Sequence, residues 1–496
     1  MGEKSQIPIK AQNSNPNKPS GAGSLWFLKF GLCLGFFFTL GIWSRPTSVH
    51  ASPILSREYY VNSHSDSPDA DGTMEKPWRS LDQLDKVVFH PGDTVLFASG
   101  SQFEGGFEVS QSGTPSGPIT FKSYGGGSPP RFANPQSVAL NGNAIRLNGS
   151  HLIVDGFFFE RCPSNPVATD IHLLGALFLT TNANHCIVRN CEMTQTPMAI
   201  TIYGQHNLIT RNYIHDDNQP VQSHWGPVCV VVCASHNEIS YNRFINYSAP
   251  SQEYGHDGGA IEIHDRSLPK EDILIHHNLS LRNQGFIEWV GRVKQDNFLI
   301  HHNVCMDYQA FLGLTGPCTN IRVENNTVVR ILAHPEDDSE DVVFWSYSGG
   351  NTNVSFQNNI FVYDSVRIEP VFARGELRHS YNLFYRTDSA VLRKQPNQDA
   401  YERRYLGGGA HLHIGDRIGN PLFRDLAHGD FRLKPGSPAI ASGTNLDYAV
   451  DFDDQPISPA KRPDMGAFQF ISSTDEAPRK QRTCSETEKS GVMNKK

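Results

Sequence analysis

Two glutamates on matching strand-like segments are the residues whose type and spacing best suit chemistry. In AIEIH (260–264) and FIEWV (286–290), apolar residues alternate with Glu262 and Glu288. If the apolar residues face a core, both carboxylates point outward at one register, about 5 Å apart on adjacent strands. Retaining glycosidases place their acid and nucleophile at a similar separation, and calcium is a competing use of the same oxygens. The plain alternative is a pair of solvated surface glutamates.

Polar residues beside these segments extend the candidate site. Asp257 precedes two glycines on the turn that enters the Glu262 segment. It is either a third carboxylate of the site or part of an ordinary Asp-Gly turn. Arg292 and Lys294 follow the Glu288 segment at alternate positions, so both could bind the carboxylate of an acidic sugar. The site therefore combines carboxylates with two cations.

The predicted site also includes aromatic side chains, because a ring that faces outward from the strands can stack on a sugar. The residues predicted to face outward are Phe286, Phe311 and Tyr203. The predicted catalytic residues are Glu262, Glu288 and Asp257, which are also the calcium ligands if the site holds calcium. The predicted substrate-binding residues are Arg292, Lys294, His256, His264, Phe286 and Tyr203.

Two further clusters have weaker chemical signals. His215, Asp216 and Asp217 open an insertion that can fold over a groove, although a plain polar loop is the favoured interpretation. The pairs His276-His277 and His301-His302 occupy equivalent positions in adjacent repeats. Repeat geometry alone generates such pairs, so we interpret them as stacked structural imidazoles rather than a metal site.

A repeat must position all of these residues. Eight segments share a short β-type alternation, then Asn, then another apolar strand, with intervals of 22 to 36 residues between the asparagines. The aligned asparagines are Asn190, Asn212, Asn242, Asn278, Asn303, Asn326, Asn359 and Asn382. Such a unit predicts one coil of a parallel β-solenoid, with an Asn ladder at a left-handed bend. Stacking the strands predicts the outward column Thr201, Val230, Glu262, Glu288 and Gly313.

Composition agrees with a turn-rich β protein. The 496 residues include 42 Gly and 31 Pro, and only 19% are charged, which does not suit a helical bundle. The net charge of -8 argues against nucleic acid as a partner, since nucleic-acid binders usually present a basic field.

The N-terminus has the pattern of an export signal. Lysines precede an apolar run from Phe30 to Trp43, and Val49-His50-Ala51 offers a cleavage site. If the segment is not cleaved, residues 25–43 form a membrane anchor. We therefore expect a secreted, periplasmic or cell-surface protein. Of nine cysteines, Cys33 lies in this segment, and the spacing of the others specifies neither a zinc site nor a disulfide.

Several segments resemble the right-handed parallel β-helix (pectate-lyase-like) superfamily of carbohydrate-active proteins. They are EYYVNSHSDSPDADGTMEKPWRSLDQL (58–84), PGDTVLF (91–97), GNPLFRDLAHGDFRLKPGSPAIASG (419–443) and PDMGAFQF (463–470). The resemblance implies an all-β, right-handed parallel β-helix with an N-terminal capping helix and a C-terminal closing coil. It also implies a polysaccharide partner, and lyases of this superfamily use calcium.

The expected organisation has five parts. They are a signal peptide or anchor (1–51), an N-terminal cap and first coils (52–140), the β-helix (141–390), C-terminal coils and cap (391–471) and a disordered charged tail (472–496). We expect an exported enzyme that cleaves glycosidic bonds on an outer groove. It is a hydrolase using the two glutamates, or a lyase on a uronic-acid polymer in which Arg292 or Lys294 acts on the uronate. The alternative is a non-catalytic glycan-binding or structural protein of the cell surface.

Overall fold

The structure is a computed structural model that describes residues 56–472. Short gaps at 136–138, 164–170, 222–224, 253–254, 265–267, 291–292, 315, 333–342, 347–350, 364–376 and 388–413 are not described. The predicted signal or anchor segment and the predicted charged tail therefore lie outside the described residues, apart from Ser472. No helix within the described part of the chain is long and apolar enough to cross a membrane.

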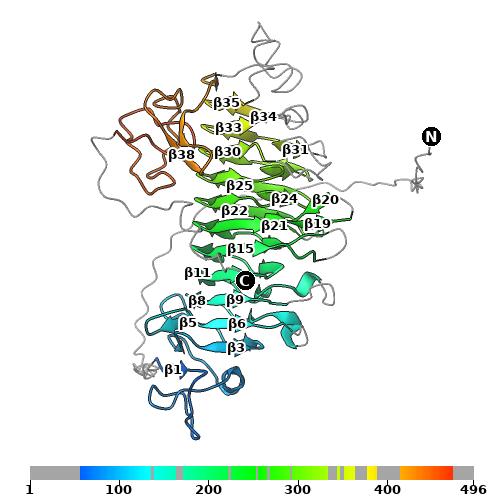
Figure 1. The fold of residues 1–496 in the computed structure, drawn as a ribbon, viewed down its shortest axis with the longest axis vertical. Helices are drawn as coiled ribbons and strands as arrows, with labels where there is room; N and C mark the ends of the chain where they lie inside the picture. Colours follow the sequence, from blue (N-terminus) through cyan, green and yellow to red (C-terminus); the bar gives the residue numbers. More distant parts are fainter. Residues whose placement is uncertain are drawn as a thin grey trace, which may run out of the picture. The chain divides into compact units, whose positions relative to one another are not determined.

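Three parallel sheets, named here A, B and C, wind into a β-helix, and from β2 to β31 the coils run through the three sheets in turn (Figure 1). Sheet A contains β1 (Glu58–Val61), β2 (Thr94–Ala98), β5 (Ile119–Tyr124), β8 (Leu152–Asp155), β11 (Ile187–Arg189), β14 (Leu208–Thr210), β17 (Glu238–Ser240), β22 (Lys270–His276), β25 (Gln295–His301), β28 (Cys318–Thr319), β29 (Arg322–Glu324), β32 (Val354–Gln357) and β34 (Leu377–Ser380).

Sheet B follows sheet A in each coil. It contains β3 (Gln102–Glu104), β6 (Arg131–Ala133), β9 (Phe158–Glu160), β12 (Glu192–Thr194), β15 (Tyr213–Asp217), β18 (Arg243–Tyr247), β23 (Leu279–Leu281), β26 (Val304–Met306), β30 (Thr327–Arg330), β33 (Ile360–Tyr363), β35 (Leu383–Arg386) and β36 (Arg417–Ile418).

Sheet C closes each coil and carries the predicted glutamates. It contains β4 (Phe107–Val109), β7 (Ile145–Leu147), β10 (Leu177–Leu179), β13 (Met198–Ile202), β16 (Val228–Val232), β21 (Gly259–Ile263), β24 (Ile287–Trp289), β27 (Leu312–Leu314) and β31 (Phe344–Ser346). Outside the coils lie the hairpins β19 (Ala249–Ser251) with β20 (Gly255–Asp257) and β37 (Phe423–Asp425) with β38 (Asp430–Leu433), and the 3₁₀ helices η1 (Leu81–Lys86), η2 (Ala139–Gly142) and η4 (Ile171–Leu173).

A buried Asn ladder runs along the corner between sheets A and B, as predicted. Each rung accepts the backbone and side-chain N–H groups of the preceding rung, as at Asn278 to Asn303, where both distances are 3.0 Å. The ladder runs through Asn212, Asn242, Asn278, Asn303, Asn326, Asn359 and Asn382 and ends on Asp416. These bonds satisfy backbone groups that a buried turn would otherwise leave unpaired.

Two details of the predicted ladder were wrong. Asn190 is outside it, because its side chain donates to Asp155 at the surface while Cys191 takes the ladder position. The left-handed residue of each bend also precedes the ladder Asn, as at Asn190 (φ 53°) and His302 (φ 49°). The ladder positions therefore require Asn for its hydrogen bonds and not for its tolerance of a left-handed backbone.

The predicted N-terminal capping helix is the 3₁₀ helix η1. Leu81 and Leu84 of η1 are buried in the main core, and Val87 packs against that core, but Val88 is 65% exposed. Ser80 makes no hydrogen bond to the helix backbone, and its hydroxyl instead bonds the side chain of Gln83. A 3₁₀ turn followed by extended Val87 rotates Val88 away from the face that an α-helix would have buried.

The C-terminal region does not add a closing coil. After β36, residues 419–470 fold back along the outer face of sheet B (Figure 1). Phe423, Phe431 and Phe452 form a second apolar cluster with outward residues of sheet B such as Leu281 and Val304. This packing buries an apolar sheet face that the coils alone would leave in water.

Candidate active site on the outer face of sheet C

The two glutamates occupy the predicted register. Glu262 on β21 pairs with Glu288 on β24, and Glu288 pairs with Gly313 on β27. The neighbouring rung was predicted wrongly: Thr201 pairs with Val231, and Val230 faces the core with no exposed surface. The all-apolar strand β16 has no alternation from which its facing could be determined.

Glu262 is surrounded by other side chains and is only 3% exposed. The indole N–H of Trp225 donates to Glu262 Oε2 at 2.9 Å. His264 Nδ1 lies 2.7 Å from Glu262 Oε1, close enough for an electrostatic contact although the two atoms are not aligned for a hydrogen bond. The His264 ring packs against Trp225 and His172, with ring centroids 5.0 and 5.8 Å apart. A buried carboxylate is thus held between an indole and an imidazole.

Trp225 reaches Glu262 because the insertion after β15 folds over sheet C. Val221 is fully buried in a small outer cluster with Val231 and Cys233, and Trp225 packs against that cluster. The Val221 N–H donates to the Trp225 carbonyl at 2.8 Å, which closes the loop on itself. The predicted folding of this insertion over the outer face is therefore present, but its apolar residues make the contact.

Asp257 forms a hydrogen bond with the end of the same loop. Its Oδ2 accepts the backbone N–H of Gly226 at 3.0 Å, and its Oδ1 accepts that of Gly258 at 2.8 Å. A Cβ at Gly226 would lie 2.0 Å from the Asp257 carbonyl oxygen, so this close approach requires glycine. The first of these bonds holds the residue that follows Trp225, and the predicted role of Asp257 as a third catalytic carboxylate stays a prediction. His256 precedes it on β20, paired with Pro250.

Glu288 has the opposite environment to Glu262, because its side chain is exposed on the outer face. A carboxylate in water and a buried one on the next rung are chemically inequivalent, and inequivalence is what divides acid and base roles in a pair. The structure therefore brings Glu262, Glu288 and His264 together, and Asp257 contacts the loop beside them.

The predicted aromatic residues have different positions. Phe286 is fully buried and stacks on Phe311 inside the core at 5.5 Å, so neither ring can meet a sugar. Tyr203 is partly buried against the same outer cluster as Trp225, with its ring centroid 5.7 Å from that of Phe178, and its predicted substrate-binding role stays a prediction. Lys294 bonds Asp296 at 2.6 Å in an exposed ion pair.

Phe286 was misjudged because it precedes β24 at a corner, where Phe286 and Ile287 both turn inward. Arg292 lies outside the described residues, so its predicted role stays a prediction.

Both Asp257 oxygens accept backbone N–H groups, and a nitrogen of His264 lies beside one oxygen of Glu262. Calcium takes six to eight oxygen ligands, which include backbone carbonyls and waters, so the predicted calcium site of Glu262, Glu288 and Asp257 stays a prediction.

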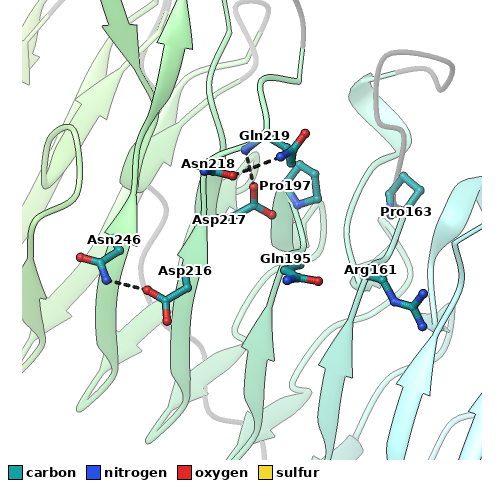
Figure 2. Close-up of a pocket in the computed structure, with 9 residues that line it drawn as sticks. All are labelled: Arg161, Pro163, Gln195, Pro197, Asp216, Asp217, Asn218, Gln219 and Asn246. Atoms are coloured by element: carbon teal, nitrogen blue, oxygen red, sulfur yellow. Dashed lines mark hydrogen bonds between the residues drawn. The ribbon is translucent and has the colours of Figure 1, made fainter. Parts of the chain in front are cut away.

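A pocket of about 540 Å³ lies on the other side of the same insertion, at the corner between sheets B and C (Figure 2). Its lining is Arg161, Pro163, Gln195, Pro197, Asp216, Asp217, Asn218, Gln219 and Asn246. Asp217 Oδ1 accepts the Gln219 N–H at 2.7 Å, while its buried Oδ2 has no hydrogen-bond partner. Burial raises the pKa of Asp217 to about 7, against the lowering effect of the Gln219 N–H.

Comparison with known proteins places this geometry in a family. The sequence profile of chondroitinase B matches residues 79–329, just over half of the chain. The chain belongs to the chondroitinase B family. No curated protein sequence matches it.

Solved structures give the fold of this family member. Pectate lyase Pel9A matches with a TM-score of 0.52 and 15% identity, over 85% of this chain and 98% of that one. XylC, solved with xylose, matches with a TM-score of 0.52 and 11% identity, over 84% and 98%. The prediction of a right-handed, pectate-lyase-like parallel β-helix is confirmed, and so is that of a carbohydrate-active enzyme of the hydrolase or lyase kind.

Sequence reasoning missed Trp225 in this chondroitinase B family protein. The signal was present, because Trp225 is the only tryptophan in the insertion at 215–227. A large amphipathic ring in an inserted loop is a good candidate for covering a groove. What no local pattern specifies is which residue of the sheet the indole N–H meets.

Proposed function

We propose that this protein is a polysaccharide lyase that cleaves a uronic-acid polymer by β-elimination on the outer face of sheet C. Membership of the chondroitinase B family carries the proposal, since that name denotes an enzyme acting on a uronic-acid polysaccharide. The contact between Glu262 and His264 beneath Trp225 supplies the chemistry. The N-terminal segment supports export to the compartment where such polymers occur.

In this proposal His264 is the base. A carboxylate at Nδ1 favours the tautomer with its proton on that nitrogen, which leaves Nε2 free to accept the C5 proton of a uronate. The C5–H bond and the C4–O bond break, a C4–C5 double bond forms, and the departing oxygen takes a proton from water. Glu262 stabilises the imidazolium that results.

The uronate carboxylate needs a cationic partner, because its neutralisation makes the C5 proton acidic. Arg292 follows β24 and is the residue the sequence offers for this role. Lys294 is committed to Asp296 and serves less well. Exposed Glu288 lies one rung from Glu262, where it can accept hydrogen bonds from sugar hydroxyls.

Hydrolysis by Glu262 and Glu288 is the second candidate. The register of the two carboxylates, one rung apart and differently exposed, favours it. In that version the buried Glu262 is the acid and Glu288 is the nucleophile. Asp257 keeps its structural role in both versions.

A panel of uronic-acid and neutral polysaccharides tests the proposal. A lyase produces new reducing ends together with the ultraviolet absorbance of an unsaturated uronate. New reducing ends without that absorbance would replace the lyase by the hydrolase. No cleavage of any substrate would leave a glycan-binding protein.

A further inference from the structure

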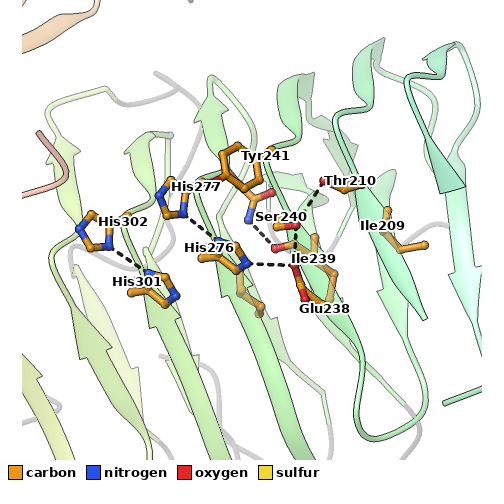
Figure 3. A network of polar contacts seen from close by, with 12 residues as sticks. Ile209, Thr210, Glu238, Ile239, Ser240, Tyr241, His276, His277, His301 and His302 are labelled. Carbon is orange, nitrogen blue, oxygen red and sulfur yellow. Dashed lines mark hydrogen bonds and ion pairs between the residues drawn. The ribbon is translucent and has the colours of Figure 1, made fainter. Parts of the chain in front are cut away.

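Four imidazoles form a compact cluster on sheet A, far along the coil from Glu262. His276 and His301 end β22 and β25, and His277 and His302 are the left-handed residues that follow them (Figure 3). His276 stacks on His301 at 4.8 Å between ring centroids, and His277 stacks on His302 at 5.2 Å. The stacking was predicted from the repeat, but stacking alone does not fix how the ring nitrogens face.

The nitrogens converge instead of pointing apart. Nδ1 of His276 lies 2.7 Å from Nδ1 of His277, and Nδ1 of His301 lies 2.9 Å from Nδ1 of His302. One ring nitrogen each from His276, His277 and His301 lies within 4.8 Å of the other two. Three imidazole nitrogens around one point are a donor set suited to zinc, copper or nickel.

The outer nitrogens determine the protonation of the inner ones. His277 Nε2 lies 3.1 Å from the Asp451 carbonyl, which only accepts hydrogen bonds, so this nitrogen carries a proton. His276 Nε2 lies 3.1 Å from a carboxylate oxygen of Glu238, which likewise accepts. A neutral imidazole protonated at Nε2 has a lone pair at Nδ1. Two lone pairs would then face each other across 2.7 Å, which requires a cation near both nitrogens.

We propose that Nδ1 of His276, His277 and His301 bind a divalent transition-metal ion of the zinc class. His302, whose Nδ1 lies 2.9 Å from Nδ1 of His301, would supply a fourth nitrogen ligand. The surrounding contacts are those found behind metal-binding histidines, because the second nitrogen of His276 meets a carboxylate and that of His277 meets a carbonyl.

The site also has a structural consequence. Asp451 belongs to the C-terminal segment folded along sheet B, and Tyr448 of the same segment stacks on His301 at 4.6 Å. A metal at the cluster would therefore tie this segment to the coils. Tetrahedral zinc places its nitrogen ligands roughly 3.4 Å apart. Metal binding would therefore separate the His276 and His277 nitrogens, which lie 2.7 Å apart, and bring the His301 nitrogen closer to both.

Cobalt provides the direct test, because tetrahedral Co²⁺ bound to imidazole absorbs visible light. Tag-free protein, first treated with a chelator, is titrated with Co²⁺ and then with Zn²⁺ as competitor. We expect one equivalent of Co²⁺ with a tetrahedral spectrum, displaced by Zn²⁺. His276→Gln and His301→Gln should each weaken binding at least about 100-fold, and Glu238→Gln about 10- to 100-fold.

A second imidazole stack gives a matched control. His185, His206 and His236 stack at 4.8 Å in successive coils, and Nδ1 of His236 lies 3.0 Å from a carboxylate oxygen of Asp272. His206→Gln should leave Co²⁺ binding unchanged.

If Co²⁺ does not bind stoichiometrically, the proposal is overturned. The cation between the Nδ1 atoms of His276 and His277 would then be a proton. Binding that survives both cluster variants, or that is lost equally in His206→Gln, would also overturn it. Thermal unfolding without metal separates lost ligands from lost fold, and Glu238→Gln tests the site with every ligand in place. None of these measurements depends on the lyase proposal.

Discussion

The indole N–H of Trp225 donates to Oε2 of Glu262 at 2.9 Å, across 37 residues of sequence. This bond joins an inserted loop to the outer face of sheet C and covers a carboxylate that open strands would expose. Asp257 fixes the loop by accepting the N–H of the next residue, Gly226. The environment of Glu262 is therefore made by the loop as much as by the sheet.

Replacement of Trp225 by Phe tests the importance of that bond. The variant keeps an aromatic ring in the outer cluster but leaves Glu262 Oε2 without its donor. A buried charge that loses a hydrogen bond costs about 1.5–3 kcal/mol, so we expect kcat/KM to fall at least about 10-fold. Tyr203→Phe, which keeps its ring in the same cluster, is the control. Equal activity of Trp225→Phe and wild type would show that the bond is irrelevant to catalysis.

The two glutamates should respond unequally to amide substitution. Glu262→Gln removes the charge that orients His264 and should reduce kcat at least about 100-fold, whereas Glu288→Gln should chiefly raise KM. Steady-state kinetics on the best substrate of the panel measures both. A loss of similar size in kcat for the two variants would favour the hydrolase, in which both carboxylates are catalytic.

The Asn ladder should determine stability. Asn303 accepts two hydrogen bonds from Asn278 and donates to Ile275 and Asn326 while fully buried. Asn303→Ala leaves several buried polar groups unpaired, so we expect a loss of at least about 3 kcal/mol in the free energy of unfolding. Denaturant titration measures it. Asn190→Gly, at the surface position with positive φ, should change stability by less than about 1 kcal/mol.

Asp217 predicts a pH effect. Burial raises the pKa of Asp217 in the folded state to about 7 from its ordinary value of 3.8. Between these values the folded state holds the proton more tightly than the unfolded chain, so the contribution of Asp217 to stability falls as pH rises through this window. Asp217→Asn removes the titration. The variant should gain melting temperature relative to wild type between about pH 4 and about pH 7.

A constant difference in melting temperature across that range would contradict the raised pKa. Asp216→Asn serves as the control, because this neighbouring carboxylate accepts from Asn246 and contacts His215 at the surface, and its pKa is lowered.

Much of this arrangement could be predicted from sequence. The regular return of Asn gave the coils, and the alternation around Glu262 and Glu288 gave their register, because both patterns are local. The predicted positions of Asn190 and Val230 were wrong by one residue. In a bend or an all-apolar strand, neighbouring residues are similar, so the sequence does not show which of them faces the core. The fold-back of residues 419–470 and the Trp225 bond depend on contacts between distant segments, which no local period encodes.

The lyase proposal predicts that no oxygen atom from water enters the products. Cleavage in heavy-oxygen water, followed by mass analysis of both product ends, distinguishes elimination from hydrolysis in a single reaction. The account predicts an unsaturated uronate at one end and no heavy oxygen in the newly formed ends, and loss of this product in Glu262→Gln. Heavy oxygen at the new reducing end with a saturated partner would contradict it.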